Sequence, residues 1–336
     1  MPNGLKVFSG SANRALASAI CNELGITLGT LNTKQFADKE LWVEFGENIR
    51  GVDVFLVQPT CFPTNDNIMQ LMLMIDAAKR ASAGRVTAVI PYYGYSRQDR
   101  KDRPRVPISA KTVAVMLEAV GADRVLTMDL HNAAEGGFFQ IPVDHLYALP
   151  VFIDYCKAKY HSQKTKIVSP DVGGTARARL FSQKLGTDLA IIDKYRQAAN
   201  VSEVMHVIGD VEGYNCILVD DMVDTAGTLC KGAEALINRG AASVSAVATH
   251  GVLSFDHKKE IHSIDKIENS LLHEVLVADT IDQNENLAKP LFQAALLRND
   301  LNVSATTKIK VLSTAGLFAS AIKAIHGNES VSGLFV

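Results

Sequence analysis

Residues 215–229 read NCILVDDMVDTAGTL, an apolar run that stops at a cluster of acids and small residues. The run from Cys216 to Val219 is short, aliphatic and free of polar alternation, which is typical of a strand covered on both faces of a parallel sheet. Residues 229–239 then have the apolar spacing of a helix. The stretch therefore predicts a buried strand, a polar tip and a helix, the repeating unit of an α/β fold.

The polar tip between this strand and helix combines two kinds of group. Thr225, Gly227 and Thr228 supply hydroxyls and an unhindered backbone, so several N–H groups can turn inward at the positive end of the helix dipole and bind a phosphate. Asp220 and Asp221 only accept hydrogen bonds when ionised, so sugar hydroxyls or a hydrated Mg²⁺ are their natural partners. An Asp/Thr helix cap is the plain alternative. The double acid favours a phosphate-and-sugar site.

Bulk properties limit the class of protein. The 336 residues suffice for two α/β domains with a core each. A formal charge of −2 argues against a general nucleic-acid or membrane surface. No apolar run reaches the span of a bilayer, and residues 1–8 lack the pattern of a secretory signal. The five cysteines are scattered and never form C-x-x-C. We expect a cytoplasmic protein with reduced cysteines that binds neither nucleic acid nor membrane.

The order of strand, polar tip and helix recurs in both halves of the chain. It predicts an α/β fold of two doubly wound parallel-sheet domains, with ligands at the carboxyl ends of the strands. Residues 136–142 interrupt the pattern before a new helix-like segment begins. We therefore expect an N-terminal domain over 1–148 and a C-terminal domain over 149–315, with the final helix, 316–336, joining the first domain.

A cationic loop connects a strand-like run to a helix in the first half. The helix can begin only after Pro107, with Ser109 as its cap, so residues 97–107 should form an exposed and mobile arm. A charge run is often only a solvated face. Arg97 and Gln98 at a strand's carboxyl end nevertheless favour a nucleotide triphosphate.

Three further segments carry polar residues whose roles the residues alone leave open. A lone histidine after a strand, such as His131, is more often structural than a ligand. Asp38 and Glu40 fit a solvated hairpin. Lys194 and Arg196 stand two apart near a strand end and so share one face, but two surface cations would look the same.

Taken together, several motifs in the right order resemble the class I ribose-phosphate diphosphokinases, also called phosphoribosyl pyrophosphate synthetases. The likeness runs from the first strand to the last helix and implies two domains of the phosphoribosyltransferase type. Residues 220–228 resemble the phosphoribosyl-diphosphate binding motif that these enzymes share with phosphoribosyltransferases. The other motifs are Phe36-Ala37-Asp38-Lys39-Glu40, Tyr95-Ser96-Arg97-Gln98-Asp99-Arg100, Asp129-Leu130-His131, Ser169-Pro170-Asp171 and Asp193-Lys194-Tyr195-Arg196.

The resemblance implies a reaction and a set of roles. The diphosphoryl group of Mg-ATP would pass to the 1-hydroxyl of ribose 5-phosphate, giving 5-phosphoribosyl 1-diphosphate and AMP for nucleotide biosynthesis. Lys194 and Arg196 would be catalytic, and His131 and Asp171 would lie at the Mg²⁺. ATP would contact Phe36, Asp38, Glu40, Arg97 and Gln98. Ribose 5-phosphate would contact Arg196, Asp220, Asp221, Asp224, Thr225, Ala226, Gly227 and Thr228.

The same resemblance implies an assembly. Phe36, Asp38 and Glu40 would complete the adenine pocket of a neighbouring subunit, which requires at least a homodimer, and the family likeness implies a homohexamer. The chain departs from the family pattern at Lys39 and Ala226, where glycine is usual. It also departs at Tyr195, where a third cation is common, and in the long segment 282–307.

Two other interpretations remain. A phosphoribosyltransferase would share the phosphate-binding tip, but it would use neither His131 nor Lys194. A non-catalytic regulatory paralogue of the same fold should have lost the catalytic arm, whereas residues 97–107 are unbroken here.

Overall fold

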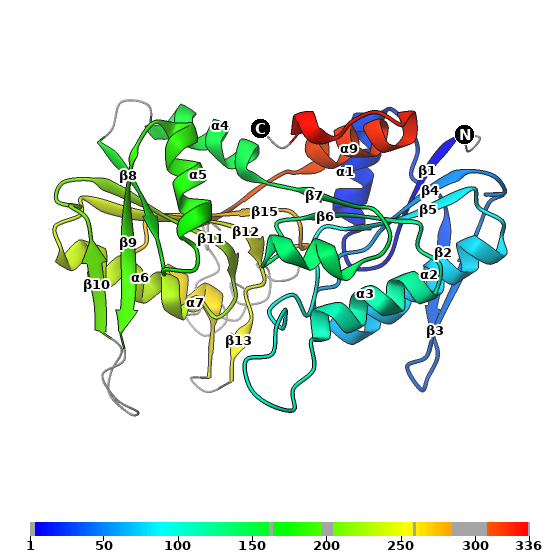
Figure 1. Cartoon of the computed structure of the whole chain (residues 1–336), viewed down its shortest axis with the longest axis horizontal. Coiled ribbons are helices and arrows are strands. Elements are labelled where there is room, and N and C mark those ends of the chain that lie inside the picture. Colours follow the sequence, from blue (N-terminus) through cyan, green and yellow to red (C-terminus); the bar gives the residue numbers. More distant parts are fainter. Residues whose placement is uncertain (1–3, 161–163, 196–203, 258–259, 284–307, 335–336) are drawn as a thin grey trace, which may run out of the picture. The chain divides into compact units, whose positions relative to one another are not determined.

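Aliphatic runs without polar alternation form two parallel sheets in the computed structural model (Figure 1). The structure describes residues 4–160, 164–195, 204–257, 260–283 and 308–334. These fall into two units. Unit 1 comprises 1–148, 280–282 and 313–336, and unit 2 comprises 149–279 and 283–312. The predicted α/β fold with parallel sheets is confirmed.

The sheet of unit 1 is parallel throughout, in the order β1-β4-β5-β6-β7. Its strands are β1 (Leu5–Ser9), β4 (Asp53–Val57), β5 (Arg85–Ile90), β6 (Arg124–Met128) and β7 (Val143–Leu146). An antiparallel hairpin stands apart from this sheet and consists of β2 (Leu31–Gln35) and β3 (Leu41–Phe45). The helical elements of unit 1 are α1 (Arg14–Leu24), α2 (Thr64–Arg80), α3 (Ser109–Ala119), η1 (Ala133–Phe138), α9 (Ala315–Gly327) and η2 (Ser332–Leu334).

The sheet of unit 2 has the order β10-β9-β8-β11-β12-β15-β16, with only β10 antiparallel among the described strands. Its strands are β8 (Thr165–Ser169), β9 (Asp188–Tyr195), β10 (Val204–Ile208), β11 (Asn215–Val223), β12 (Ser243–Gly251), β15 (Val275–Ala278) and β16 (Ile309–Leu312). Its helices are α4 (Leu149–Tyr160), α5 (Thr175–Leu185), α6 (Gly227–Asn238) and α7 (Ser263–Glu268), and a short hairpin consists of β13 (Phe255–Asp256) and β14 (Ile261–His262).

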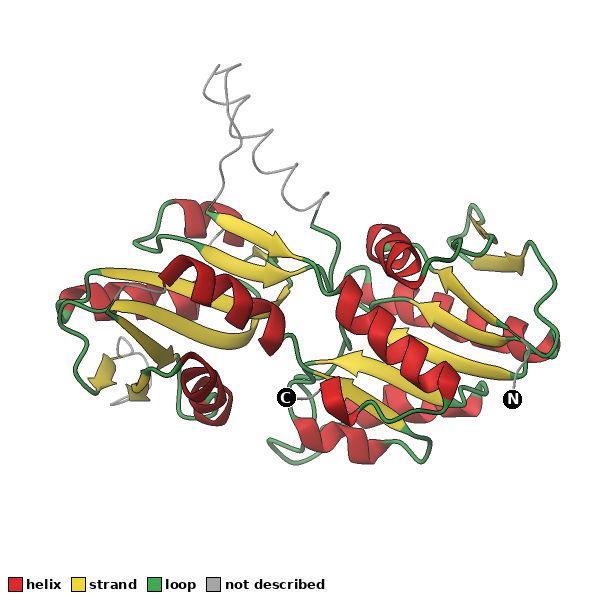
Figure 2. Cartoon of the chain, turned by 90° about the horizontal axis from the view of Figure 1, so that it is seen from above, coloured by secondary structure: helices red, strands yellow, loops and turns green. Residues whose placement is uncertain are grey.

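Helices lie on both faces of each sheet, which explains why the central strands are apolar along their whole length (Figure 2). All five residues of β4 are buried. Leu71 and Met74 of α2 are fully buried in the core of unit 1, and such a side chain contributes about 1.5–3 kcal/mol by leaving water. All five cysteines are free, as expected. None of the described helices has both the length and the apolar character needed to cross a membrane.

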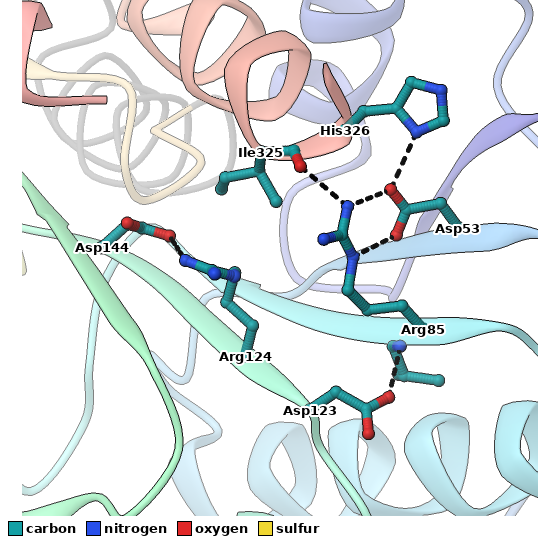
Figure 3. Close-up of polar contacts among 8 residues, drawn as sticks. Asp53, Arg85, Asp123, Arg124, Asp144, Ile325 and His326 are labelled. Carbon is teal, nitrogen blue, oxygen red and sulfur yellow. Dashed lines mark hydrogen bonds and ion pairs between the residues drawn. The ribbon is translucent and has the colours of Figure 1, made fainter. Parts of the chain in front are cut away.

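A buried ion pair connects the C-terminal helix to the sheet of unit 1. The carboxylate of Asp53, at the start of β4, is fully buried and accepts hydrogen bonds from the Nε and Nη2 of Arg85, at the start of β5 (Figure 3). The same Nη2 donates to the carbonyl of Ile325 at 2.9 Å, and His326 Nδ1 lies 2.8 Å from Asp53 Oδ2. Helix α9, which packs beside α1, is therefore bonded directly to β4 and β5.

Replacing Arg85 by Met should destabilise unit 1 strongly, because it leaves a buried carboxylate without its cation. Removing one partner of such a pair typically costs about 3–5 kcal/mol, which corresponds to a fall of on the order of 10 °C in melting temperature. Lys79→Met is the matched control, since its partner Asp123 is half-exposed and the pair contributes about 1 kcal/mol or less. Equal melting temperatures for the two variants by scanning calorimetry would contradict the expectation.

Candidate active site

The polar residues of unit 2 gather where β8, β9 and β11 end. β8 pairs in parallel with both β9 and β11, so the carboxyl ends of all three lie at one edge of the sheet. Asp171 follows β8, Lys194 lies near the end of β9, and Asp220 and Asp221 lie in the last part of β11. In this fold class, ligands bind at such an edge.

Strand β11 is longer than the sequence indicated. It runs to Val223 because its last residues pair with β12, with Asp220 opposite Ala248. The two acids therefore lie within the strand, and the backbone N–H of Asp221 donates to Asp220 Oδ1 at 2.9 Å. Asp221 is 4 % exposed, whereas the Asp220 side chain keeps about a fifth of its surface.

Arg177 on α5 compensates this acidic pair. Its Nη1 lies 3.3 Å from Asp221 Oδ1 and 3.7 Å from Asp220 Oδ1. Burial, together with the neighbouring Asp221 carboxyl, still raises the pKa of Asp220. A cation or a set of hydroxyl donors arriving at Asp220 would stabilise its charged form and reverse that shift.

The loop after β11 has the geometry expected of an anion site. Ala226 adopts a left-handed conformation with φ 57°, and α6 begins at the next residue without a side-chain cap. The first backbone N–H groups of α6 thus lie at the positive end of the helix dipole. Ala226 is buried, Gly227 is half-buried and Thr228 is exposed, so the loop presents Thr228 and its backbone to solvent. The interval 224–228 is called the cradle below.

Asp171 lies in the turn between β8 and α5. Its Oδ1 accepts the N–H of Gly174 at 2.8 Å, and its carbonyl accepts the hydroxyl of Ser169 at 2.7 Å. These bonds fix the orientation of a half-buried carboxylate at the sheet edge. No group of three or more potential metal ligands occurs among the described residues.

The predicted catalytic residues Lys194 and Arg196 lie partly or wholly outside the described residues. The backbone of Lys194 belongs to β9 and pairs with Met205 of β10, while its side chain lies outside the described residues. Arg196 lies outside them altogether.

In unit 1, the predicted ATP and metal residues occupy two loops that are connected by a buried carboxylate. Glu135 is 1 % exposed and accepts the hydroxyl of Ser96 and the N–H of Asn132. The hydroxyl of Ser96 also accepts the N–H of His131 at 3.1 Å. The loop after β5 is therefore held against the loop after β6.

Residues 97–107 are mostly exposed, as expected of an arm. Ser109 does not cap α3: it is the first helical residue, and Ile108 occupies the cap position. The hydroxyl of Ser109 donates instead to Gln98 Oε1, so it orients one of the predicted ATP residues. Arg97 is exposed beside it.

The β2–β3 hairpin carries the remaining predicted ATP residues. Phe36, Asp38 and Glu40 lie in its turn and, with Ala37, line a shallow concavity. The ring of Phe36 is 53 % exposed, which is unusual for a large apolar side chain. Lys39 in this turn adopts φ 76°, a left-handed conformation.

Known proteins match the chain over nearly its whole length. Residues 5–121 match the N-terminal domain of ribose phosphate pyrophosphokinase, and residues 196–336 match the phosphoribosyl synthetase-associated domain. The chain is 51 % identical to ribose-phosphate pyrophosphokinase of Wolinella succinogenes over 99 % of both chains, and 52 % identical to that of Burkholderia pseudomallei over 99 % of this chain and 98 % of the other. The chain belongs to the ribose-phosphate pyrophosphokinase family.

A solved structure agrees with this assignment. The crystal structure of phosphoribosylpyrophosphate synthetase from Mycobacterium smegmatis superimposes with a TM-score of 0.85 at 37 % identity, covering 97 % of this chain and all of the other. The family predicted from the motifs is confirmed. Neither a phosphoribosyltransferase nor a silent paralogue is favoured by relatives of this kind.

The sequence alone did not indicate the roles of Arg177 and Glu135, which lie beside the predicted site residues. Arg177 stands three residues after the glycine pair 173–174, and only the parallel pairing of β8 with β11 brings it to the acids of β11. Glu135 has no apolar pattern around it that would indicate burial. A glutamate three residues after Asn132 does form a capping box, which is the signal that could have drawn attention to it.

Ala226→Gly should stabilise this pyrophosphokinase slightly. A left-handed conformation costs a non-glycine residue about 1–2 kcal/mol, of which the larger entropy of unfolded glycine cancels part. Ala235→Gly, in the interior of α6, is the control and should lower stability by about 1 kcal/mol. Ala226→Val should lower the melting temperature below that of the wild type, since a β-branched residue tolerates this conformation poorly. If Ala226→Gly and Ala235→Gly change the melting temperature in the same direction, the backbone of Ala226 is not strained.

Glu135 predicts a pH dependence of stability in unit 1. Burial raises the pKa of Glu135 from 4.5 to about 6, so the folded state binds the proton more tightly than the unfolded state. The stability that the folded protein gains from protonating Glu135 is fully present below pH 4.5. It is lost as the pH rises through about 6 and amounts to up to about 2 kcal/mol.

The neutral variant Glu135→Gln lacks this titration. Its melting temperature relative to the wild type should therefore rise between pH 4.5 and 7. A difference between the two proteins that stays constant over this range would show that Glu135 does not titrate there.

Proposed function

We propose that this pyrophosphokinase transfers the diphosphoryl group of Mg-ATP to the 1-hydroxyl of ribose 5-phosphate, giving 5-phosphoribosyl 1-diphosphate and AMP for nucleotide biosynthesis. The observation that carries the proposal is the combination, at the end of β11, of two carboxylates with an uncapped helix N-terminus. The cradle would bind the 5-phosphate through its backbone N–H groups and the hydroxyls of Thr225 and Thr228. Asp220 and Asp221 would accept hydrogen bonds from the ribose hydroxyls.

The nucleotide would bind through residues from several elements. Arg97 and Gln98 would contact the ATP of their own subunit. Phe36, Asp38 and Glu40 would line the adenine pocket of a neighbouring subunit, for which their exposure in the β2–β3 hairpin is suitable. The proposal thus requires a homo-oligomer, and we propose a hexamer that acts in the cytoplasm.

The metal proposed here is Mg²⁺, with Asp171 and His131 beside it. Mg²⁺ usually keeps several waters and takes one or two carboxylates in addition to substrate phosphates, so the single oriented carboxylate of Asp171 is an adequate donor. When bound, the ion would neutralise charge on the triphosphate. The imidazole of His131 is a weaker match to Mg²⁺, and its exposed position suits a contact through water or phosphate.

The chemistry leaves the protein chiefly the tasks of alignment and charge stabilisation. The sugar's 1-oxygen would bond to the β-phosphorus while the bond from that phosphorus to the α–β bridging oxygen breaks, and the hydroxyl proton would pass to solvent. Lys194 and Arg196 would stabilise the negative charge that develops during transfer. The arm 97–107 would fold over ATP and exclude water, which would otherwise compete with the sugar.

The reaction itself gives the test of the proposal. The purified protein, incubated with ATP, Mg²⁺ and ribose 5-phosphate, should release AMP and form 5-phosphoribosyl 1-diphosphate in equal amounts. Release of AMP that does not depend on ribose 5-phosphate, or no AMP at all, would contradict it. A phosphoribosyltransferase would instead consume 5-phosphoribosyl 1-diphosphate together with a base.

Lys194→Ala should lower turnover by on the order of 10²–10³-fold, because a charge that stabilises the transition state is lost, and should change the KM for ribose 5-phosphate much less. Lys184→Ala is the control, since Lys184 is exposed in the last turn of α5. Steady-state kinetics measures both. Near-normal turnover in Lys194→Ala would refute the catalytic role.

A further inference from the structure

The backbone carbonyls at the start of the cradle are all bonded to one neighbouring segment. The N–H of Leu253 donates to the carbonyl of Val223 at 2.9 Å, and the N–H of Ser254 donates to that of Asp224 at 3.2 Å. The third carbonyl, that of Thr225, accepts a hydrogen bond from Lys266 Nζ at 3.0 Å. Leu253, Ser254 and Lys266 thus hold three consecutive peptide groups.

The direction of a carbonyl fixes the direction of the N–H in the same peptide group. In a trans peptide the two bonds point in opposite directions within one plane. Because the carbonyl of Thr225 points to Lys266, the N–H of Ala226 must point away from α7. The N–H groups of Asp224 and Thr225 are turned away from residues 253–254 for the same reason. Successive N–H groups directed away from a supporting segment are the arrangement that binds an anion.

Of these three carbonyls, the one of Thr225 is held by a side chain, so it is the one that a substitution can release. Lys266 lies on α7 with 12 % of its side chain exposed, and its Nζ also lies 2.6 Å from Asp256 Oδ2 on β13. The Asp256 side chain is 16 % exposed. This sheltered pair leaves Lys266 little freedom to follow the loop elsewhere, because moving its ammonium would separate it from a partly desolvated carboxylate.

We propose that Lys266, paired with Asp256, is a positioning residue for the sugar phosphate: it orients the Thr225–Ala226 peptide so that the N–H of Ala226 points into the cradle. This inference rests on the proposed function, in which the cradle binds the 5-phosphate of ribose 5-phosphate. Lys266 does not touch the substrate. It also supports the left-handed conformation of Ala226, because that conformation depends on where the preceding peptide lies.

The decisive variant is Lys266→Met, which keeps an unbranched apolar stem and removes the donor. The KM for ribose 5-phosphate should rise at least tenfold, and the KM for ATP should stay within about twofold, since only the anion-binding N–H of the cradle is released. Lys266→Arg can still donate to the carbonyl of Thr225 and should restore the KM to within about threefold. A loss of structure alone would raise both KM values or lower kcat without this separation.

Lys308→Met is the matched control, because Lys308 Nζ donates to the carbonyl of Ser270 at 2.8 Å, a bond of the same kind elsewhere in unit 2. It should change neither KM. If Lys266→Met does not fold, Asp256→Asn provides the test, because it keeps the lysine but loosens it. We expect the KM for ribose 5-phosphate alone to rise by about threefold in that variant. An unchanged KM in either folded variant overturns the proposal.

Thr228→Val separates this inference from the proposed function. Thr228 belongs to the cradle itself, so its loss should also raise the KM for ribose 5-phosphate. If Thr228→Val leaves that KM unchanged, the cradle does not bind the sugar phosphate and the proposed function of the loop fails. If Thr228→Val raises it and Lys266→Met does not, only the role of Lys266 fails.

Discussion

Strands that pair in parallel end at the same edge of their sheet, and the chemistry of both units depends on this constraint. In unit 2 the pairing of β8 with β11 brings Asp171 to the same edge as Asp220, although the two are 49 positions apart in the sequence. In unit 1 the pairing of β5 with β6 brings Ser96 to His131. The apolar interiors of the strands supply stability, so the residues at the strand ends can be polar and can contact a ligand.

Placing carboxylates at these edges and under the helices has a cost, because a buried charge loses its hydration. The structure offsets that cost with direct partners. Burial of Glu274, just before β15, would raise the pKa of its carboxyl, yet hydrogen bonds from Lys159 and Tyr160 lower that pKa on balance. Asp220 is different, since burial beside Asp221 raises its pKa and Arg177 offsets this only partly. The incomplete compensation occurs at the edge where a ligand would supply further donors.

Local pattern was sufficient for the strands and for the family, but not for contacts between distant segments. The strand predicted over 216–219 is present and buried, because its aliphatic residues alone indicate burial on both faces. β11 continues past its predicted end because pairing with β12 extends it, which no local pattern reveals. Ser109 was predicted to cap α3, yet its hydroxyl donates to Gln98 in the preceding loop, a contact that local pattern does not reveal. The roles of Lys194 and the other site residues stay predictions.

Lys39 and Ala226, for which the resemblance implied glycine, lie at backbone positions where glycine would be favoured. Lys39 adopts φ 76° and Ala226 adopts φ 57°. Each costs about 1–2 kcal/mol, so each loop needs bonds that hold it in place. In the hairpin, the N–H of Phe36 donates to the carbonyl of Glu40 at 2.8 Å and the N–H of Lys39 to that of Phe36 at 3.0 Å. In the cradle, the bond from Lys266 has this task. A side chain from another element thus helps to determine the shape of this strained loop. The proposed binding of the sugar phosphate by the cradle would therefore depend on α7 as well as on the cradle's own residues.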